Sequence, residues 1–360
     1  PRTIKMRFKW DMNTDPKERI ASIKFLPVNE EDELEKEVAL TIKQEASPEI
    51  TDDRRGDSIA IVIASTKLRS MISWDTSERL DYWAGITVWE RTDKGVTPEQ
   101  IGRVRSVEFK MLNTKEELPA EIGKIKYLET LVVASNTNTQ LLPATYRIGN
   151  ALKGLQHLKN LTISAMGITT ISKSELEGSC QILTKLDLSS NNFEVMGKSG
   201  STINGVKVLG IESITRKNFP HLRNLYLNKI NRYDTTKDLS AYTDKKDEKL
   251  GFRWTTGFGE GFLTPAEGYN NSYFKELLKW EELECLSLSL NMLDGQLPSD
   301  AEVKQLLGAD KVYTESYIQN AAYKDTISIQ DAEKYLLANG GAPRVWPKMK
   351  SLSLNLNFLT

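Results

Sequence analysis

The chain is poor in the side chains that carry most acid–base, metal and redox chemistry. It has two histidines and two cysteines among 360 residues. Two cysteines cannot hold together a disulfide-rich fold of this size, and two histidines leave little for a metal centre or a general base. Segments long and apolar enough to span a membrane are also missing, since no run approaches the roughly 18 apolar residues that such a helix needs.

An excess of charge of either sign is missing as well. The chain has 48 Lys and Arg against 49 Asp and Glu, a net charge of -1. This balance argues against a nucleic-acid-binding protein and against a cationic membrane-surface protein. Hydrophobic residues make up 39% of the sequence, enough for a real core, so wholesale disorder is excluded.

Familiar catalytic motifs are absent from the sequence. It has no Gly-x-Ser-x-Gly elbow, no phosphate loop, no His-Glu-x-x-His and no Cys-x-x-Cys. We therefore expect no catalytic residue, no cofactor and no metal, and we do not expect an enzyme. Cys180 and Cys285 are predicted to be free thiols. They belong to different copies of the internal repeat described below, with another copy and two insertions between them.

Short alternating segments dominate residues 1–96. Apolar and polar residues alternate in four stretches, which is the period of a strand with one buried face. The apolar positions are Ile4, Met6, Phe8 and Trp10; Val38, Leu40 and Ile42; Ile59, Ile61 and Ile63; and Ile86 and Val88. Turn-rich stretches separate them, so we predict a small all-β, sandwich-like domain over residues 1–96.

Two short motifs in this segment have a functional and a structural interpretation. Asp11-x-Asn13-x-Asp15 is similar to the start of a calcium loop, but Pro16 stands where the loop needs glycine, so an Asx turn explains it better. Arg55-Gly56-Asp57 spells an integrin-type adhesion motif, and a glycine turn before a strand explains it equally well.

Residues 97–360 contain an internal repeat of the form Leu-x-x-Leu-x-Leu-x-x-Asn-x-Leu. Clean copies begin at Leu183, Leu283 and Met349, and weaker ones begin at Val104, Leu128, Leu158 and Leu222. This pattern resembles the leucine-rich repeat family. Leu118-Pro119-x-x-Ile122-Gly123 and Gly295-x-Leu297-Pro298 resemble its plant-type subclass.

The resemblance implies an α/β solenoid, a horseshoe in which each strand buries its leucines against the next repeat. The repeated asparagine would bond exposed backbone where each strand turns. Asn136, Asn191, Asn291 and Asn357 fit that role, whereas Met166 and Ile230 interrupt it. Thr97, Pro98 and Gln100 predict a short capping helix at the entry to the repeats. His157 and His221 each precede the first leucine of a repeat, which favours a structural role for both.

Spacing between equivalent leucines locates three insertions. From residue 107 to residue 352 the steps are 24, 30, 25, 39, 61 and 66 residues, whereas the family's repeats usually run about 20–29. The insertions lie near 194–218, 231–280 and 294–346. The second is rich in aromatic residues beside glycine and asparagine, which suits either a ligand site or the insertion's own small core.

Outward positions of the predicted strands are mostly small, neutral and rich in hydroxyls and amides, with Tyr226 as the one aromatic residue. This surface is either a binding face or a plain solvated one. The candidate ligand-binding residues on the face and in the second insertion are Tyr226, Trp254, Phe258, Tyr269 and Tyr273.

The layout, a small β domain before plant-type repeats with long insertions, is similar to surface or secreted leucine-rich repeat proteins of gut Bacteroidetes. That resemblance implies a non-catalytic protein outside the cytoplasm, at the cell surface or secreted, with a possible lipid anchor upstream of the given chain. It would recognise a protein or glycan, with no nucleic acid as partner. Two alternatives remain: an accessory region of a larger enzyme, and a structural adhesion spacer.

Overall fold

The computed structural model describes most of residues 13–230 and shorter pieces of the remainder. The described residues are 5, 13–25, 38–72, 74–112, 117–135, 148–193, 202–203, 206–207, 211, 213–230, 232–233, 254–255, 277–278, 280–291, 293–295, 297, 303, 328, 330–332, 334 and 345–359.

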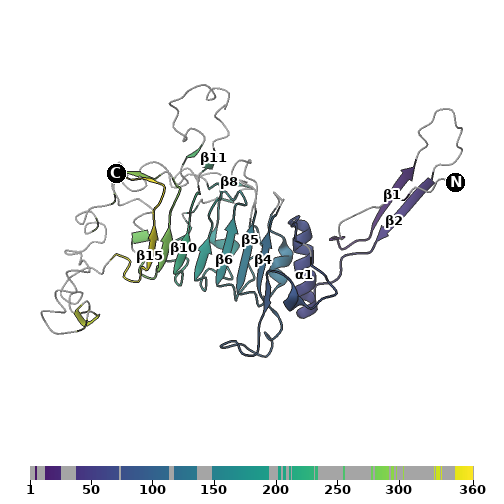
Figure 1. Ribbon diagram of the computed structural model, residues 1–360, viewed down its shortest axis with the longest axis horizontal. Coiled ribbons are helices and arrows are strands. Elements are labelled where there is room, and N and C mark those ends of the chain that lie inside the picture. The colour runs from purple at the N-terminus through teal and green to yellow at the C-terminus, as the bar shows by residue number, and fades with distance from the viewer. Residues whose placement is uncertain are drawn as a thin grey trace, which may run out of the picture.

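One eight-stranded sheet forms the centre of the molecule (Figure 1). Its order is β15-β13-β10-β7-β6-β5-β4-β3, and all neighbours are parallel except β3 and β4. The strands are β3 (Ile86–Val88), β4 (Val104–Lys110), β5 (Thr130–Ala134), β6 (Asn160–Ser164), β7 (Lys185–Asp187), β10 (Asn224–Tyr226), β13 (Cys285–Ser287) and β15 (Ser351–Ser353). From β4 onward the spatial order follows the chain, so each repeat adds one strand beside the previous one.

The repeated apolar positions stand in one register across the sheet. The paired residues are Val107, Leu131, Leu161, Leu186, Leu225, Leu286 and Leu352, in order from β4 to β15. The first six are at most 1% exposed, and Leu352 in the edge strand β15 is 43% exposed. One hydrophobic core therefore runs continuously behind the parallel strands and is open at the described end of the sheet.

The chain leaves each strand through the same kind of turn. The residue just before the repeated asparagine position has a positive φ at Ala165, Ser190, Lys229, Leu290 and Leu356. This left-handed conformation is uncommon outside glycine, and its recurrence at one repeat position marks a conserved geometry of the turn within this chain.

Asparagine side chains bridge the turns of neighbouring repeats, as the repeat pattern predicts. Asn191 Nδ2 donates to the carbonyl oxygens of Ile163, 2.7 Å away, and Leu188, 2.8 Å away. Asn357 Oδ1 accepts from the backbone N–H of Asn291 at 2.9 Å. The prediction is confirmed for Asn191, Asn291 and Asn357, and Asn136 lies outside the described residues.

The two interrupted turns are capped from the following repeat. Asn191 Oδ1 accepts from the backbone N–H of Met166 at 3.1 Å, and Asn291 Oδ1 accepts from that of Ile230 at 2.9 Å. Met166 and Ile230 are both buried. In these turns an apolar side chain stands where the asparagine is missing, and the asparagine of the next turn accepts the hydrogen bond from the backbone N–H.

The strand expected at Ile59, Ile61 and Ile63 is wrong. The structure has a helix there, α1 (Arg54–Lys67), which begins where the Asp53 side chain accepts from the N–H of Gly56. The buried residues Ala60, Ile61, Ala64 and Leu68 recur at three- and four-residue intervals, so a helical period was present beneath the alternating one.

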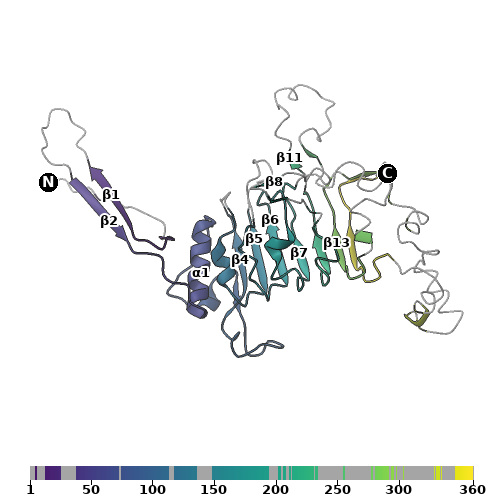
Figure 2. The ribbon, with the colours of Figure 1, turned by 180° about the vertical axis from the view of Figure 1, so that it is seen from behind.

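Other described residues of the 1–96 segment do not form a sandwich. β1 (Arg19–Phe25) and β2 (Val38–Gln44) make an antiparallel hairpin apart from the main sheet, whereas α1, η1 (Leu80–Tyr82) and β3 share the core of β4 (Figures 1 and 2). The sandwich-like interpretation therefore needs correction for these residues. The boundary expected after residue 96 falls inside continuous packing.

A buried ion pair joins α1 to the sheet. Arg103 Nε and Nη2 donate to the two carboxylate oxygens of Asp57 at 2.8 and 2.9 Å, and the N–H of Val104 donates to the same carboxylate at 3.1 Å. Asp57 is 1% exposed, so the Arg55-Gly56-Asp57 motif presents no accessible carboxylate for adhesion. Asn13 accepts from the N–H of Asp15 at 3.1 Å, an Asx turn, while Asp11 lies outside the described residues.

The side of the repeats opposite the strands is built from turns and 3₁₀ helices. η2 (Ala120–Lys124) follows the Leu-Pro phrase, and a Cβ at Gly123 would lie 2.5 Å from the backbone oxygen of Ala151. Glycine is needed there because the two backbones nearly touch. η4 (Lys173–Leu176) begins with a capping box. Around residues 97–100 the structure has a turn, not the predicted capping helix, although Gln100 Oε1 accepts from the N–H of Thr97 at 2.8 Å.

Short paired strands occur in and beside the insertions. β8 (Thr202–Ile203) pairs with β9 (Val206–Lys207), β11 (Arg232–Tyr233) with β12 (Trp254–Thr255), and β14 (Asp294–Gly295) with β16 (Phe358–Leu359). Both cysteines are free, as predicted. Among the helices that the structure describes, none has the length and apolarity to cross a bilayer.

Candidate functional site

One surface of the parallel strands carries two rows of mostly polar side chains, which we call the polar sheet face. Because neighbouring strands are in register, equivalent side chains lie side by side. The first row is Thr130, Asn160, Lys185, Asn224, Cys285 and Ser351, and the second is Val132, Thr162, Asp187, Tyr226, Ser287 and Ser353. Ser189, Asn228 and Ser289 continue the face where β7, β10 and β13 end.

Hydrogen bonds between strands hold the first row in place. Asn160 Nδ2 donates to Thr130 Oγ1 at 3.0 Å, and Thr184 Oγ1 donates to Asn160 Oδ1 at 3.3 Å. An amide fixed at both ends by neighbouring strands loses little further rotamer entropy when a ligand binds. This part of the face is therefore preorganised.

A second network lies where the strands end. Ser287 Oγ donates to Asn228 Oδ1 at 2.6 Å, and the N–H of Ser289 donates to the same oxygen at 2.8 Å. The hydroxyls of Ser289 and Ser353 are 2.8 Å apart. Three successive strands are thus connected through their outward side chains.

Tyr226 is the aromatic residue of the polar sheet face. Its half-buried ring lies with its centroid 5.5 Å from the Lys185 ammonium of the neighbouring strand. Burial, with a smaller contribution from Cys285, raises the pKa of the Tyr226 phenol above its ordinary value of 10. The phenol therefore stays protonated at neutral pH and can donate a hydrogen bond.

The structure does not bring the predicted ligand-binding residues together. Tyr226 is on the polar sheet face, while Trp254 is in β12, where its backbone pairs with Tyr233. Phe258, Tyr269 and Tyr273 lie outside the described residues. Whether the aromatic insertion contributes to a site stays a prediction.

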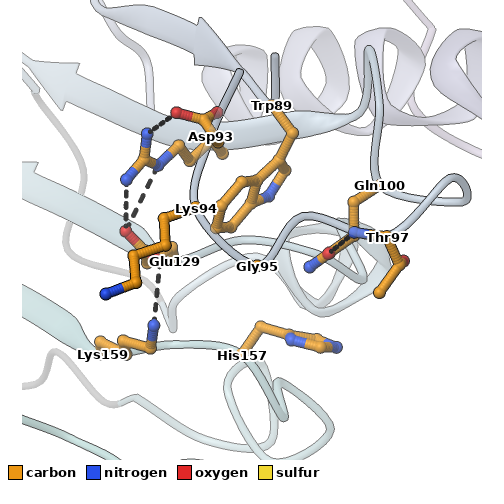
Figure 3. A pocket seen from close by; sticks show the side chains of 10 residues that line it. Trp89, Asp93, Lys94, Gly95, Thr97, Gln100, Glu129, His157 and Lys159 are labelled. Atoms are coloured by element: carbon orange, nitrogen blue, oxygen red, sulfur yellow. Dashed lines mark hydrogen bonds and ion pairs between the residues drawn. The ribbon is translucent and has the colours of Figure 1, made fainter. Parts of the chain in front are cut away.

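A cavity of about 430 Å³ lies near the β3 end of the main sheet, beside the beginnings of β4, β5 and β6 (Figure 3). We call it the edge cavity. It is lined by Trp89, Asp93, Lys94, Gly95, Thr97, Gln100, Arg105, Glu129, His157 and Lys159. The first six come from one segment after β3 and the others from the starts of successive repeats, so the cavity forms where that segment covers the sheet.

Ion pairs form one wall of the edge cavity. Arg105 donates to Asp93 Oδ1 at 2.9 Å and to Glu129 Oε1 at 3.1 Å, and Lys159 Nζ donates to Glu129 Oε2 at 3.2 Å. The Arg105 guanidinium also lies 4.6 Å from the centre of the Trp89 ring. Arg105, Glu129 and Asp93 each have two or more partners, which fixes the positions of these three side chains in the wall.

Sequence reasoning missed the edge cavity, although one signal was present. Arg105, Glu129 and Lys159 occupy the same repeat position, and their charge alternates in sign along the chain. Backbone bonds from Glu129 N–H to Arg105 O and from Lys159 N–H to Glu129 O place them side by side. Alternating charge at a repeat position predicts a cross-strand ion-pair row.

His157 lines the edge cavity and packs on Tyr127, with ring centroids 5.3 Å apart. Burial, then repulsion from Lys159 and Lys126, lowers its pKa from the ordinary value of 6.5. His157 is therefore neutral at physiological pH, whereas His221 is exposed and lies in another repeat. Within the described part of the chain, no group of three or more His, Cys, Asp or Glu side chains is arranged to hold a metal ion.

Comparison with known proteins gives little beyond this geometry. No protein-family model and no curated protein matches the chain. A crystal structure of a plant ice-binding protein is similar at a TM-score of 0.40 and 15% identity, covering 86% of this chain and 73% of that one. A likeness at that level does not identify the fold or the function.

Proposed function

We propose that the chain is a non-catalytic leucine-rich repeat protein that binds a glycan outside the cytoplasm through the polar sheet face. The supporting observation is the in-register array of hydroxyl and amide side chains on parallel strands, held by cross-strand hydrogen bonds. Hydroxyls and amides donate and accept hydrogen bonds as sugar hydroxyls do. An array repeated strand after strand suits an extended polymer.

Composition of the face favours a glycan over a protein partner. Protein hot spots are enriched in Trp, Tyr and Arg, and the two rows contain Tyr226 alone from that set. Lys185 and Asp187 are the charged residues of the rows and lie in one strand. Binding should therefore depend weakly on salt. The Tyr226 ring offers a stacking surface for a sugar's apolar face.

The leucine-rich repeat assignment rests on the register of the buried leucines and on the asparagine bridges. Placement at the cell surface or in the secreted fraction, with a possible lipid anchor, rests on the sequence resemblance to gut Bacteroidetes proteins. An accessory region of a larger enzyme and a structural spacer remain the competing proposals. A spacer would show no saturable binding.

A glycan array followed by titration of the best binder tests the proposal. Tyr226→Ala should weaken binding at least about tenfold, the equivalent of about 1.4 kcal/mol, and leave the chain folded at the temperature of the assay. Tyr82→Ala is the matched control, because Tyr82 is 69% exposed in η1 and outside the polar sheet face. Saturable binding to proteins alone, or glycan binding that survives Tyr226→Ala unchanged, would count against this function.

A further inference from the structure

We propose that the edge cavity is a second binding site, separate from the polar sheet face, for a small ligand that carries one carboxylate and several hydroxyls, such as a uronic acid. Its volume of about 430 Å³ is within the usual range for small-molecule sites. The polar groups of its lining divide into those already bonded within the protein and those that are not.

The acceptors of the cavity are occupied by the protein itself. Asp93 accepts from Arg105 through Oδ1 and from the N–H of Glu90 through Oδ2, at 2.9 and 2.8 Å. Glu129 accepts from Arg105 through Oε1 and from Lys159 through Oε2. Both carboxylates are thus neutralised, and a ligand gains little by presenting a cation or further donors to them.

Donors of the cavity, in contrast, are left over. Lys94 is exposed at the rim, and no residue that the structure describes forms an ion pair or hydrogen bond with its ammonium. Three cations, Lys94, Arg105 and Lys159, face the two carboxylates of Asp93 and Glu129, so the lining carries one excess positive charge. One carboxylate would balance it.

Gln100 is aimed into the cavity by its own capping bond. The side chain belongs to a residue only 6% exposed, and its Oε1 accepts from the N–H of Thr97 at 2.8 Å. The amide nitrogen therefore points the other way, toward the space above His157 (Figure 3). No described residue accepts a hydrogen bond from Nε2, and this nitrogen is not among the buried side-chain atoms that lack a partner. The donor is therefore open to the cavity and available to a ligand acceptor.

His157 and Trp89 define the remaining walls. The neutral imidazole offers one donor and one acceptor, which matches a hydroxyl group. Trp89 is fixed, because its Nε1 donates to the carbonyl oxygen of Tyr127 at 2.9 Å and Arg105 covers its ring. A rigid indole wall beside free donors suits a compact, oxygen-rich ring that bears a negative charge.

Calorimetric titration of the whole chain with glucuronate, glucose and acetate tests the proposal. Glucuronate should bind saturably, and glucose and acetate should each bind at least about tenfold more weakly, since one lacks the charge and the other the hydroxyls. Raising the salt concentration should weaken glucuronate binding, because the Lys94 contact is exposed.

Variants locate the site. Lys94→Ala should reduce glucuronate affinity about tenfold or more, whereas Lys153→Ala, which removes an exposed lysine paired with Glu177 outside the cavity, should leave it unchanged. Tyr226→Ala should also leave it unchanged, so this site and the polar sheet face can fail independently. Equal affinity for glucuronate, glucose and acetate, or full affinity in Lys94→Ala, overturns the proposal.

Discussion

At the scale of single residues, the asparagines of the turns join the backbone of neighbouring repeats. Asn191 is fully buried and bonds backbone groups of two repeats: it accepts from Met166 and Ile168 and donates to Ile163 and Leu188. A buried backbone group that loses its partner costs about 1–3 kcal/mol. One side chain thus closes its own turn and the preceding one.

Asn191→Ala should therefore lower the free energy of unfolding by about 2–4 kcal/mol, because several buried backbone groups lose their partner together. Chemical denaturation followed by circular dichroism measures the change. Asn355→Ala is the control: it is exposed, and its substitution should cost less than about 0.5 kcal/mol. Equal costs for the two variants would mean that the asparagine bridges contribute nothing specific.

His157 gives the molecule a dependence on pH whose sign follows from its surroundings. Burial, Lys159 and Lys126 lower the folded-state pKa and Glu129 only partly opposes them, so the unfolded chain takes up the proton more readily. Stability associated with His157 is then complete above the ordinary pKa of 6.5 and declines as the pH falls below it, until the folded-state pKa is passed.

Replacing His157 by Gln should flatten the loss of stability between pH 7.5 and pH 5, which a series of thermal melts would record. The exposed Asn355, which does not ionise, supplies the comparison, and Asn355→Ala should keep the wild-type pH profile. If His157→Gln keeps that profile too, the acid sensitivity arises elsewhere.

At the scale of elements, the sequence predicted the parallel strands well and α1 poorly. The spacing Leu-x-x-Leu-x-Leu assigns each strand's inward residues without ambiguity, because every copy repeats it. For α1, alternating isoleucines and a helical spacing coexist in the same residues. The helix is also held by a partner far along the chain, Arg103, which donates to the carboxylate of Asp57. A local pattern holds no information about that pairing.

For a related reason, only the ion-pair row of the edge cavity left a signal in the sequence. Its lining combines the segment after β3 with side chains of three repeats, and only the folded chain places Lys94 and Gln100 above His157. The polar sheet face, by comparison, could be identified because its positions repeat. Sequence reasoning therefore located the repeated surface and missed the site formed at the junction.

Strands also differ in how deeply they bury the same repeat position, which allows a matched comparison. Leu186 in β7 is fully buried, and Leu352 in the edge strand β15 is 43% exposed. Leu186→Ala should cost about 2–5 kcal/mol of unfolding free energy by leaving a cavity, and Leu352→Ala less than about 1.5 kcal/mol. Urea denaturation measures both, and the reverse order would contradict the register.

Charged residues at one repeat position form ion pairs in two groups of three residues. Arg105, Glu129 and Lys159 form one group, and Arg223 and Lys350 flank Glu284 in the other, with Thr184 between the groups at the same repeat position. Each exposed pair contributes at most about 1 kcal/mol. Their main effect is on pairing, since a strand shifted by one repeat would bring like charges together.

At the scale of the whole molecule, every strand of the main sheet from β5 to β13 pairs only with the strands of the repeats before and after it. At the β4 end, the row of parallel strands is covered by the antiparallel β3 and by α1 with its buried ion pair. Unfolding should therefore begin at β15, the end where an inward leucine remains open to solvent. Hydrogen exchange resolved by strand should be slowest between β4 and β7 and faster toward β15.

The regular spacing of the strands lets the polar sheet face discriminate between polymers by their repeat length. Neighbouring strands lie about 4.8 Å apart. Side chains at equivalent positions, such as Thr130, Asn160, Asn224 and Ser351, are therefore spaced across the face by multiples of that distance. A polymer whose monomers advance by a similar distance stays in register with the strands, and each added unit meets the equivalent position of the next strand. A polymer of another pitch drifts out of phase within a few units, however similar its functional groups. Selectivity would then depend on how closely the repeat length of the polymer matches the spacing of the strands. Affinity should increase with oligomer length until the oligomer is longer than the row of strands.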